Sequence, residues 1–519
     1  MLRRAIDASA VALILTVGQG CGSSTNATAP DASAGSDGST DAGVGEASAS
    51  EGGEGGAACG AMPPTGTQLV KSTDPLVVLK LTDDDHAVYE DLTTQELYAV
   101  AIAGGSPSDI GKMTSQGGTV WTHGTAVVYL PIAADPQTDI APISAWTASA
   151  GTGVISKSAI AVDSYYYTYD ASKDGQWVAY FASTANSPTA TLTVSTIDGK
   201  TQTPLMPNID LTDESCFPPA VQFVNDTLIA QYCVTPVAND AGVTPGETST
   251  IVAFTAPSFT AVTLGTTFTP TPGPVAVDPT GTMALLPPPG GSGLLLYPLA
   301  GGTPVVVDPN GVNALFTATG DILYTNSSGA LVRYAAATST MTTLVPSGLA
   351  IPFDVSPDGN WVQLASEESA STGLTNLYLA SATTPGAATA VVKTETASPE
   401  GFTADSKYSV FGSGFPMDFG PSTYTMQAST TAGGAPVKVL SAAAGAYFTT
   451  GSKLVTNTNQ SKATGAADIV SVDLSSTAGP TTLVNQADPN LFMTATNQVV
   501  YSWYCQENGM AGVWTLTAP

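Results

Sequence analysis

Positively charged residues are the scarcest chemical class in this chain of 519 residues. Lysine and arginine together number 14, against 42 aspartates and glutamates, which gives a formal net charge of -28. Charged residues of both signs make up only 11% of the sequence, well under the roughly 25% of an ordinary soluble domain. We therefore expect no nucleic acid partner, because proteins bind its phosphates mainly through lysine and arginine.

Long apolar runs and long helical segments are also missing. The run from Ala8 to Val17 spans about ten residues, whereas a membrane-spanning helix needs about 20, and no later stretch reaches that length. The chain contains 52 glycines and 37 prolines, which destabilise helix interiors. These features exclude a helical bundle or coiled coil and predict no transmembrane helix.

The amino terminus has the features of an export signal. Two arginines within Met1 to Arg4 precede the small and apolar run, which ends in Gly18-Gln19-Gly20-Cys21. This pattern predicts a secretory signal peptide over residues 1–20. The cysteine after a small residue resembles the lipobox of bacterial lipoproteins, which implies that Cys21 is lipidated and anchors an exported protein in the bacterial cell envelope, facing the periplasm or the cell surface. Cleavage near Gly20 and release as a secreted protein is the alternative.

The next segment, residues 21–66, is a predicted tether. It consists almost entirely of glycine, alanine, serine, threonine, aspartate and glutamate, with no aromatic residue, lysine or arginine. Such a segment buries too little apolar surface to offset the entropy lost on ordering, so we expect it to be disordered. A folded body follows over residues 67–519, with one possible internal boundary in the proline-rich stretch 269–274.

Two nine-residue segments of the body match each other closely. Residues 170–178 and 354–362 are identical at six of nine positions, including Asp174-Gly175 and Asp358-Gly359. An Asp-Gly pair between apolar runs is typical of a tight turn, because glycine accepts a positive φ. Each copy is therefore predicted to be the tip of a β-hairpin.

Weaker versions of this pattern recur along the whole body. Ten units of about 37 to 54 residues begin near Leu81, Val120, Tyr169, Phe223, Val277, Phe316, Phe353, Phe402, Phe448 and Phe492. Repeats of this length built from short strands are typical of a β-propeller with four-stranded blades. We expect an all-β propeller of about seven to ten blades, as one large ring or two joined propellers. The last unit is short, and the isolated strand predicted at 67–73 would complete it.

The segment Ser356-Pro357-Asp358-Gly359-Asn360-Trp361-Val362 resembles the WD40-like repeat of TolB-type β-propellers. Tricorn-protease and prolyl-oligopeptidase propellers contain the same kind of repeat. The resemblance implies a propeller fold and work in the cell envelope on proteins or cell-wall components. It does not imply one function, because the fold serves many.

The cysteines predict disulfides rather than a metal site. Besides Cys21 there are four, and export into an oxidising compartment favours their pairing. Cys216 and Cys233 flank a predicted hairpin with its turn near Asn225, so they should face each other. Cys59 would then pair with Cys505 and fasten the end of the tether to the last unit. No spacing typical of a zinc site occurs.

Candidate catalytic residues are few. His86 and His123, the only histidines, fall at the turns of the first two units and could form an acid-base or metal-binding pair, although polar loop residues are the simpler interpretation. Asp83 to Asp85 could bind Ca²⁺ or form a solvated acidic turn. We therefore expect a monomeric, non-catalytic binding or scaffold module for a protein or glycan partner, without cofactor or metal. The alternative is a carbohydrate-active hydrolase or lyase that uses rim carboxylates and histidine.

Overall fold

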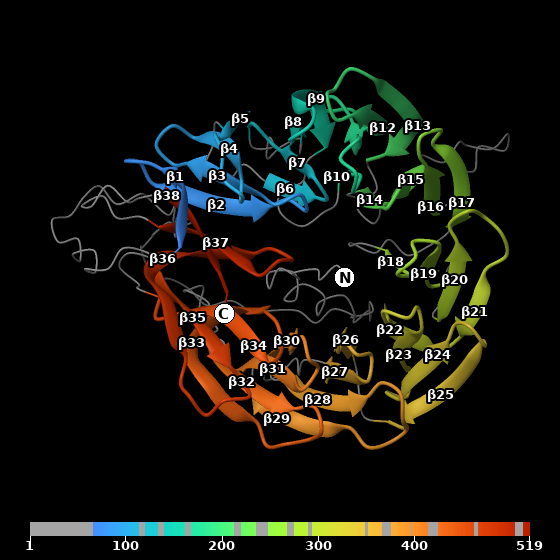
Figure 1. Ribbon diagram of the computed structural model, residues 1–519. Helices are drawn as coiled ribbons and strands as arrows, with labels where there is room; N and C mark the ends of the chain where they lie inside the picture. Colours follow the sequence, from blue (N-terminus) through green and yellow to red (C-terminus); the bar gives the residue numbers. More distant parts are fainter. Residues whose placement is uncertain are drawn as a thin grey trace, which may run out of the picture.

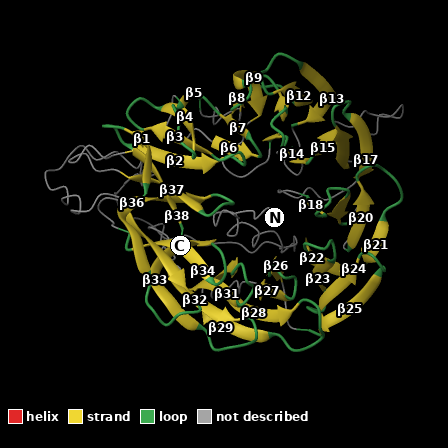
Figure 2. Ribbon diagram, in the orientation of Figure 1, coloured by secondary structure: helices red, strands yellow, loops and turns green. Residues whose placement is uncertain are grey.

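The computed structural model describes residues 66–113, 120–132, 140–160, 168–211, 219–234, 248–266, 275–288, 293–347, 351–365, 375–395, 397–413, 424–460, 466–503 and 512–518. Over these ranges the chain forms strands and no helix (Figure 2). A helix long and apolar enough to cross a membrane is accordingly not found in the described part. The predicted signal peptide, tether and 269–274 boundary, together with Cys21, Cys59, Cys216 and Cys505, lie outside the described residues.

Consecutive strands pair antiparallel in groups of four. Four groups are separate sheets. Their strands are β2 (Leu76–Leu81), β3 (His86–Asp91), β4 (Glu96–Ala101) and β5 (Ser108–Lys112); β18 (Ala276–Val277), β19 (Met283–Leu286), β20 (Leu294–Pro298) and β21 (Val305–Asp308); β22 (Gly311–Phe316), β23 (Ile322–Asn326), β24 (Leu331–Ala335) and β25 (Thr340–Val345); and β26 (Ile351–Val355), β27 (Trp361–Ala365), β28 (Thr375–Ser381) and β29 (Thr389–Glu395).

Three more groups are joined edge to edge in a sheet of twelve strands. The joints are narrow, because one residue pair links β11 to β9 and one links β13 to β15. The strands are β6 (Val120–His123), β7 (Ala126–Tyr129), β8 (Ile140–Thr147), β9 (Gly151–Ile160), β10 (Tyr169–Ala171), β11 (Trp177–Ala182), β12 (Thr189–Thr196), β13 (Gln202–Asp210), β14 (Ala220–Val224), β15 (Thr227–Val234), β16 (Thr248–Thr255) and β17 (Thr260–Thr266).

The remaining strands form a sheet of ten. Its long strands β33 and β36 each pass from one group into the next, since β33 pairs with β32 over its first half and with β34 over its second. The strands are β30 (Ala397–Phe402), β31 (Tyr408–Ser413), β32 (Tyr424–Thr430), β33 (Val437–Phe448), β34 (Lys453–Thr458), β35 (Ala467–Asp473), β36 (Thr481–Met493), β37 (Gln498–Trp503), β38 (Gly512–Thr517) and β1 (Thr67–Lys71).

The groups follow one another around a central space (Figure 1). The first strand of a group, such as β6, β10 or β26, lies nearest the centre, and the fourth, such as β13, β21 or β25, lies at the periphery. This radial arrangement of antiparallel sheets is that of a β-propeller. The group boundaries match the predicted units, because each predicted start falls on the innermost strand of a group or directly at its end.

Apolar side chains fill the spaces between neighbouring groups. Val88 and Leu97 of the first group pack against Val127, Tyr129 and Trp146 of the second, and all five are buried. Each group thus covers the apolar face of the next. A single four-stranded sheet could not bury its own apolar faces. Burial of this apolar surface, worth about 25 cal/mol per Å², is the main force that holds the groups together.

The first and last strands of the described body lie in one sheet. β1 pairs antiparallel with β38, from Thr67 opposite Thr515 to Lys71 opposite Gly512. The structure therefore confirms the prediction that an amino-terminal strand completes the last unit. The first group also packs on this sheet, where Val78 and Val100 share a buried cluster with Val500 and Val513.

Candidate functional site

The turns between the first and second strands of the groups share one geometry. Ser172 donates a hydrogen bond to Asp174 (2.6 Å) and accepts one from the backbone of Trp177 (2.9 Å). Ser356 makes the same two bonds, with Asp358 and Trp361, at the same distances. Gly175 and Gly359 have φ values of 67° and 73°, where glycine is favoured. The predicted hairpin tips are therefore confirmed, and the sequence identity arises from this hydrogen-bond pattern.

These turns are joined from group to group by backbone hydrogen bonds. The amide of Asp83 donates to the carbonyl of Gly124 (2.7 Å), and the amide of Thr125 donates to that of Lys173 (3.3 Å). Farther along, the amide of Asp358 donates to the hydroxyl of Ser406 (3.0 Å). We call this edge of the molecule, with its turns after the first and third strands of the groups, the turn rim. The bonds make it a connected surface rather than a set of independent loops.

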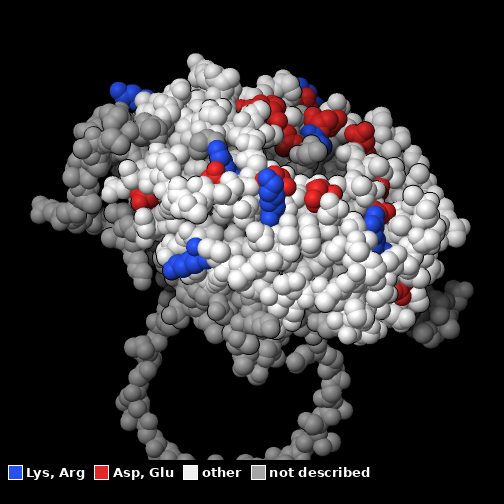
Figure 3. Space-filling view, turned by 60° about the horizontal axis from the view of Figure 1, so that its bottom comes forward, with Lys and Arg blue, Asp and Glu red and all other residues white. Residues whose placement is uncertain are grey.

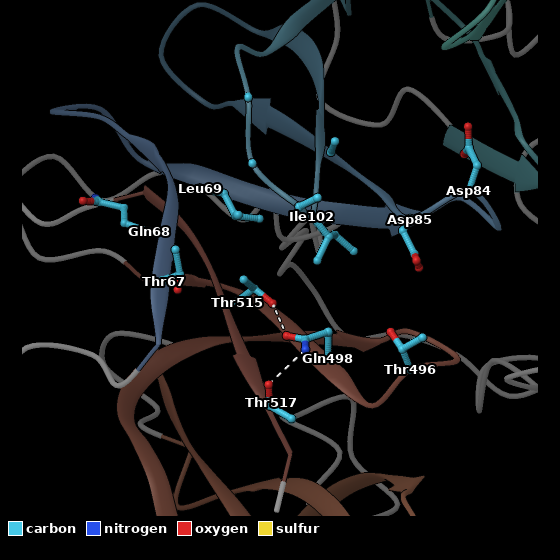
Figure 4. Close-up of a pocket in the computed structure, with 14 residues that line it drawn as sticks. Thr67, Gln68, Leu69, Asp84, Asp85, Ile102, Thr496, Gln498, Thr515 and Thr517 are labelled. Atoms are coloured by element: carbon cyan, nitrogen blue, oxygen red, sulfur yellow. Dashed lines mark hydrogen bonds between the residues drawn. The ribbon is translucent and has the colours of Figure 1, made fainter.

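A groove of about 760 Å³ opens on the turn rim where the first group meets the sheet that contains β1, β37 and β38 (Figure 4). We call it groove 1. Eight of the 14 described residues that line it carry a hydroxyl, amide or carboxylate group, and none is basic. The lining consists of Thr67, Gln68, Leu69, Asp84, Asp85, Ala101, Ile102, Ala103, Gly104, Gly105, Thr496, Gln498, Thr515 and Thr517.

Hydrogen bonds fix the polar wall of groove 1. The amide nitrogen of Gln498 donates to the hydroxyl of Thr517 (2.9 Å), and its oxygen accepts from the hydroxyl of Thr515 (3.3 Å). On the opposite wall, the carboxylate of Asp85 is directed toward Thr496, whereas that of Asp84 points away (Figure 4). Polar groups from both walls can therefore approach one ligand.

A second groove, of about 490 Å³, lies at an equivalent place in the third group. This groove 2 is lined by Ser149, Ala150, Asp174, Gly175, Gln176, Trp177, Thr196, Ile197, Asp198, Lys200 and Thr201. It includes the turn after the first strand and the turn after the third, as groove 1 does. The ammonium of Lys200 lies 2.8 Å from Asp198 and lowers the pKa of that carboxyl through the hydrogen bond it donates.

The two histidines lie beside different carboxylates. The Nδ1 atom of His123 lies 2.9 Å from Asp170, which also accepts from the amides of Ala171 (2.8 Å) and Phe223 (2.7 Å). The Nδ1 atom of His86 lies 3.3 Å from Asp84. The structure thus gives each imidazole its own acidic neighbour.

The acidic turn at Asp83 to Asp85 is exposed and internally bonded. Thr82 donates to Asp84 (2.6 Å), and Asp85 adopts a left-handed conformation with φ of 58°. Among the described residues, no group of three or more histidine, cysteine, aspartate or glutamate side chains could hold a metal ion. The exposure of these carboxylates and their bonding within the turn fit a solvated acidic turn.

A carboxyl group that the sequence did not indicate lies on an innermost strand. Glu400 sits at a β-bulge of β30, where the register shifts between Pro399 and Gly401. Burial raises the pKa of Glu400 to about 7, although a hydrogen bond with Tyr424 acts in the opposite direction. A bulge can redirect a side chain and often occurs beside functional sites. Hydrophobic patterning cannot reveal such a position, because the bulge depends on strand pairing.

Acidic side chains gather on part of one face of the molecule. Figure 3 shows acidic side chains gathered around a hollow near the top of the view, while lysine and arginine side chains are scattered singly. This distribution agrees with the net charge of -28. Such a field repels anionic ligands.

One cysteine of the predicted disulfides lies in the described part of the chain. Cys233 is disulfide-bonded and lies on β15, which pairs with β14 across the predicted turn at Asn225 and Asp226. Cys233 is the only cysteine in the described ranges, so its partner lies outside them. Its pairing with Cys216, and that of Cys59 with Cys505, stay predictions.

Comparisons with known proteins find distant structural likeness only. No family model and no curated protein matches the chain. A eukaryotic initiation factor is similar over 73% of this chain and 90% of its own, with 10% identity and a TM-score of 0.45. An oligogalacturonate lyase in complex with manganese is similar over 45% of this chain and 71% of its own, with 14% identity and a TM-score of 0.32. A prolyl endopeptidase is similar over 69% of this chain and 54% of its own, with 13% identity and a TM-score of 0.36. Because these TM-scores are low, function must be argued from the chain's own residues.

Proposed function

We propose that this protein is an envelope-anchored lipoprotein whose ten four-stranded blades form one closed propeller, and that its turn rim binds a protein or glycan of the cell envelope without chemical catalysis. The observation that carries the proposal is groove 1, an open site of about 760 Å³ with hydrogen-bonding groups on both walls. Its described lining residues offer hydroxyl, amide and carboxylate groups and include no basic residue or metal-binding cluster. Such a site recognises a ligand more readily than it transforms one.

The proposed tether would set how far from the membrane the body can bind its partner. A lipid on Cys21 would be the only membrane attachment, and about 45 flexible residues have a reach of roughly 35 to 40 Å. The body would then search for its partner at that distance from the membrane as a monomer. The negative charge of both tether and body would keep it away from anionic lipid headgroups.

The test measures retention of the full-length protein on isolated envelope fractions. The double variant Asp85→Ala, Gln498→Ala removes one polar group from each wall of groove 1. We expect retention to fall at least tenfold, whereas the control Thr263→Ala, an exposed residue of β17, should leave it unchanged. Equal retention of all three proteins would refute binding through groove 1.

Glu400 supports a second candidate function, a carbohydrate-active enzyme. A carboxyl with a pKa of about 7 is protonated in a large fraction of molecules near neutral pH and can act as a general acid. Turnover of a panel of glycans should then be abolished by Glu400→Gln. Turnover that is absent, or unchanged in the variant, excludes this role for Glu400.

A further inference from the structure

We propose that the turn rim binds a linear polymer of uncharged, hydroxyl-rich units, a neutral polysaccharide, with one segment in groove 1 and another in groove 2. This inference rests on the proposed function and specifies its ligand. It begins from the equivalent positions of the two grooves. Each groove combines the turn after the first strand of a group with the turn after the third strand of that same group.

The order of the four-stranded groups around the ring sets the relative positions of the two grooves. Groove 1 belongs to the first group and groove 2 to the third, so one group lies between them along the ring (Figure 1). The hydrogen bonds from Asp83 to Gly124 and from Thr125 to Lys173 connect these three groups at the turn rim. A ligand that repeats along its length can therefore present the same chemistry to both grooves.

The side chains of groove 1 suit hydroxyl ligands. Thr496, Thr515, Thr517 and Gln498 offer donors and acceptors together, which is what a sugar hydroxyl requires because it is itself both. The bonds from Gln498 to Thr515 and Thr517 use only one hydrogen and one lone pair of its amide group. The second N–H hydrogen and second oxygen lone pair of the Gln498 amide can therefore bind a ligand group that both accepts and donates hydrogen bonds.

Charge disfavours an anionic polymer. Asp85 is directed into groove 1 and none of the described lining residues is basic, so a uronate, sulfate or phosphate polymer would meet repulsion. In groove 2 Lys200 pairs with Asp198 and Asp174 is the other carboxylate of the described lining, so a polymer that is cationic throughout would meet an ammonium group there. Trp177 also borders groove 2, but its ring packs edge to face on Phe259 in the core, so the recognition argued here rests on the polar groups.

Neither groove alone is expected to bind tightly. Both are open and polar, and a hydrogen bond gained from water contributes little net affinity. Linking two weak contacts through one ligand can raise affinity about a hundredfold or more, because the second contact becomes intramolecular. The affinity should therefore increase steeply once a chain is long enough to span both grooves.

Titration calorimetry of the full-length protein tests this inference. The probes are size series of neutral cello-, xylo- and malto-oligosaccharides and their polymers, with polygalacturonate and chitosan as anionic and cationic comparators. The groove 1 variant is Gln498→Ala with Thr517→Val, the groove 2 variant is Gln176→Ala with Thr201→Val, and Thr263→Ala is the control. Thermal unfolding establishes that each variant is folded.

We expect at least one neutral series to bind about a hundredfold more tightly as long chains than as short ones. Either groove variant should remove this gain, while the control keeps it. Affinity that does not depend on chain length, preference for a charged polymer, or no binding of any neutral series overturns the inference. If no neutral series binds but envelope retention still depends on groove 1, the proposed binding function stands with a protein partner. If retention does not depend on groove 1 either, the proposed function and this inference both fail.

Discussion

At the residue scale, Glu400 is a carboxyl group whose pKa lies well above its usual range. Its pKa is raised from 4.5 to about 7 by burial at the bulge of β30. The folded state therefore binds the proton more strongly than the unfolded state does. By linkage, this carboxyl contributes stability below pH 4.5 that is lost progressively as the pH rises to about 7.

The variant Glu400→Gln should remove this pH dependence. Because a shift of one pKa unit corresponds to about 1.4 kcal/mol, the wild type should lose roughly 2 to 3 kcal/mol of unfolding free energy between pH 4.5 and 7 that the variant retains. Urea unfolding at a series of pH values measures the difference. Tyr424→Phe is the complementary variant: loss of the Tyr424 bond should raise the pKa of Glu400 further and extend the decline to higher pH. Parallel curves for wild type and Glu400→Gln would contradict the assignment.

Two turn glycines have similar backbones but different surroundings. Gly124 has φ of 59°, and a Cβ atom there would lie 1.8 Å from the carbonyl oxygen of Lys173. Gly359 has φ of 73°, with no atom within 4 Å of the corresponding position. Gly359→Ala should cost only the left-handed backbone penalty, about 1 to 2 kcal/mol. Gly124→Ala adds a clash that breaks the link to the next turn, so we expect about 3 kcal/mol or more. Denaturant unfolding that gave equal losses would refute a tight contact between these turns.

At the element scale, Asp170 ties three innermost strands together. Its carboxylate on β10 accepts from His123 at the end of β6 and from the amide of Phe223 on β14, and it is 3% exposed. Asp170→Ala should lower the unfolding free energy by about 2 to 4 kcal/mol, because two backbone amides and an imidazole lose a charged acceptor. His123→Ala leaves both amide bonds in place and should cost about 1 kcal/mol. Similar losses in the two variants would show that the imidazole is the dominant partner.

Turns and bulges differ in how well the sequence predicts them. A turn such as Asp174-Gly175 is encoded locally, since a short polar residue and a glycine satisfy its geometry whatever lies around it. The bulge at Glu400 is not, because it depends on how β30 aligns with β31 across a whole strand. The same holds for the bulge of β36 between Ala487 and Leu491, which also could not be read from residue order.

At the scale of the whole molecule, the pairing of β1 with β38 joins the two ends of the body. A Cβ atom on Gly512 would lie 1.8 Å from the carbonyl oxygen of Val70 on β1. Gly512→Ala should therefore separate these strands, and hydrogen exchange should show that β1 and β38 lose protection before the other sheets. Gly479→Ala, where a Cβ atom meets nothing within 4 Å, is the matched control. Unchanged protection of β1 in Gly512→Ala would mean that this pairing does not stabilise the ends.

The proposed anchor makes a separate prediction about the whole molecule. Cys21→Ser removes the sulfur to which a lipid would be attached. The protein should then move from the membrane pellet to the soluble fraction when cells are broken, while its thermal unfolding stays the same because the body is unchanged. A variant that remained in the pellet would refute lipidation at Cys21.

The sequence by itself determined the repeat, the all-β class and the positions of the turns. These depend on local chemistry: strand residues alternate, and the pairs Asp174-Gly175 and Asp358-Gly359 mark hairpin tips. It also determined the negative charge, which is a sum over residues and needs no structure. The role of Thr67 to Lys71 was predictable because the last unit lacked one strand.

Only the tertiary structure decided which side chains meet. Asp170 is 47 positions from His123 and 53 from Phe223 along the chain, and groove 1 brings Asp85 near Thr496. Nothing in the composition of these segments encodes the distances, because they follow from the packing of one sheet against the next. For the same reason, sequence alone could not show that the two histidines lie beside separate carboxylates, Asp84 and Asp170, in the folded protein.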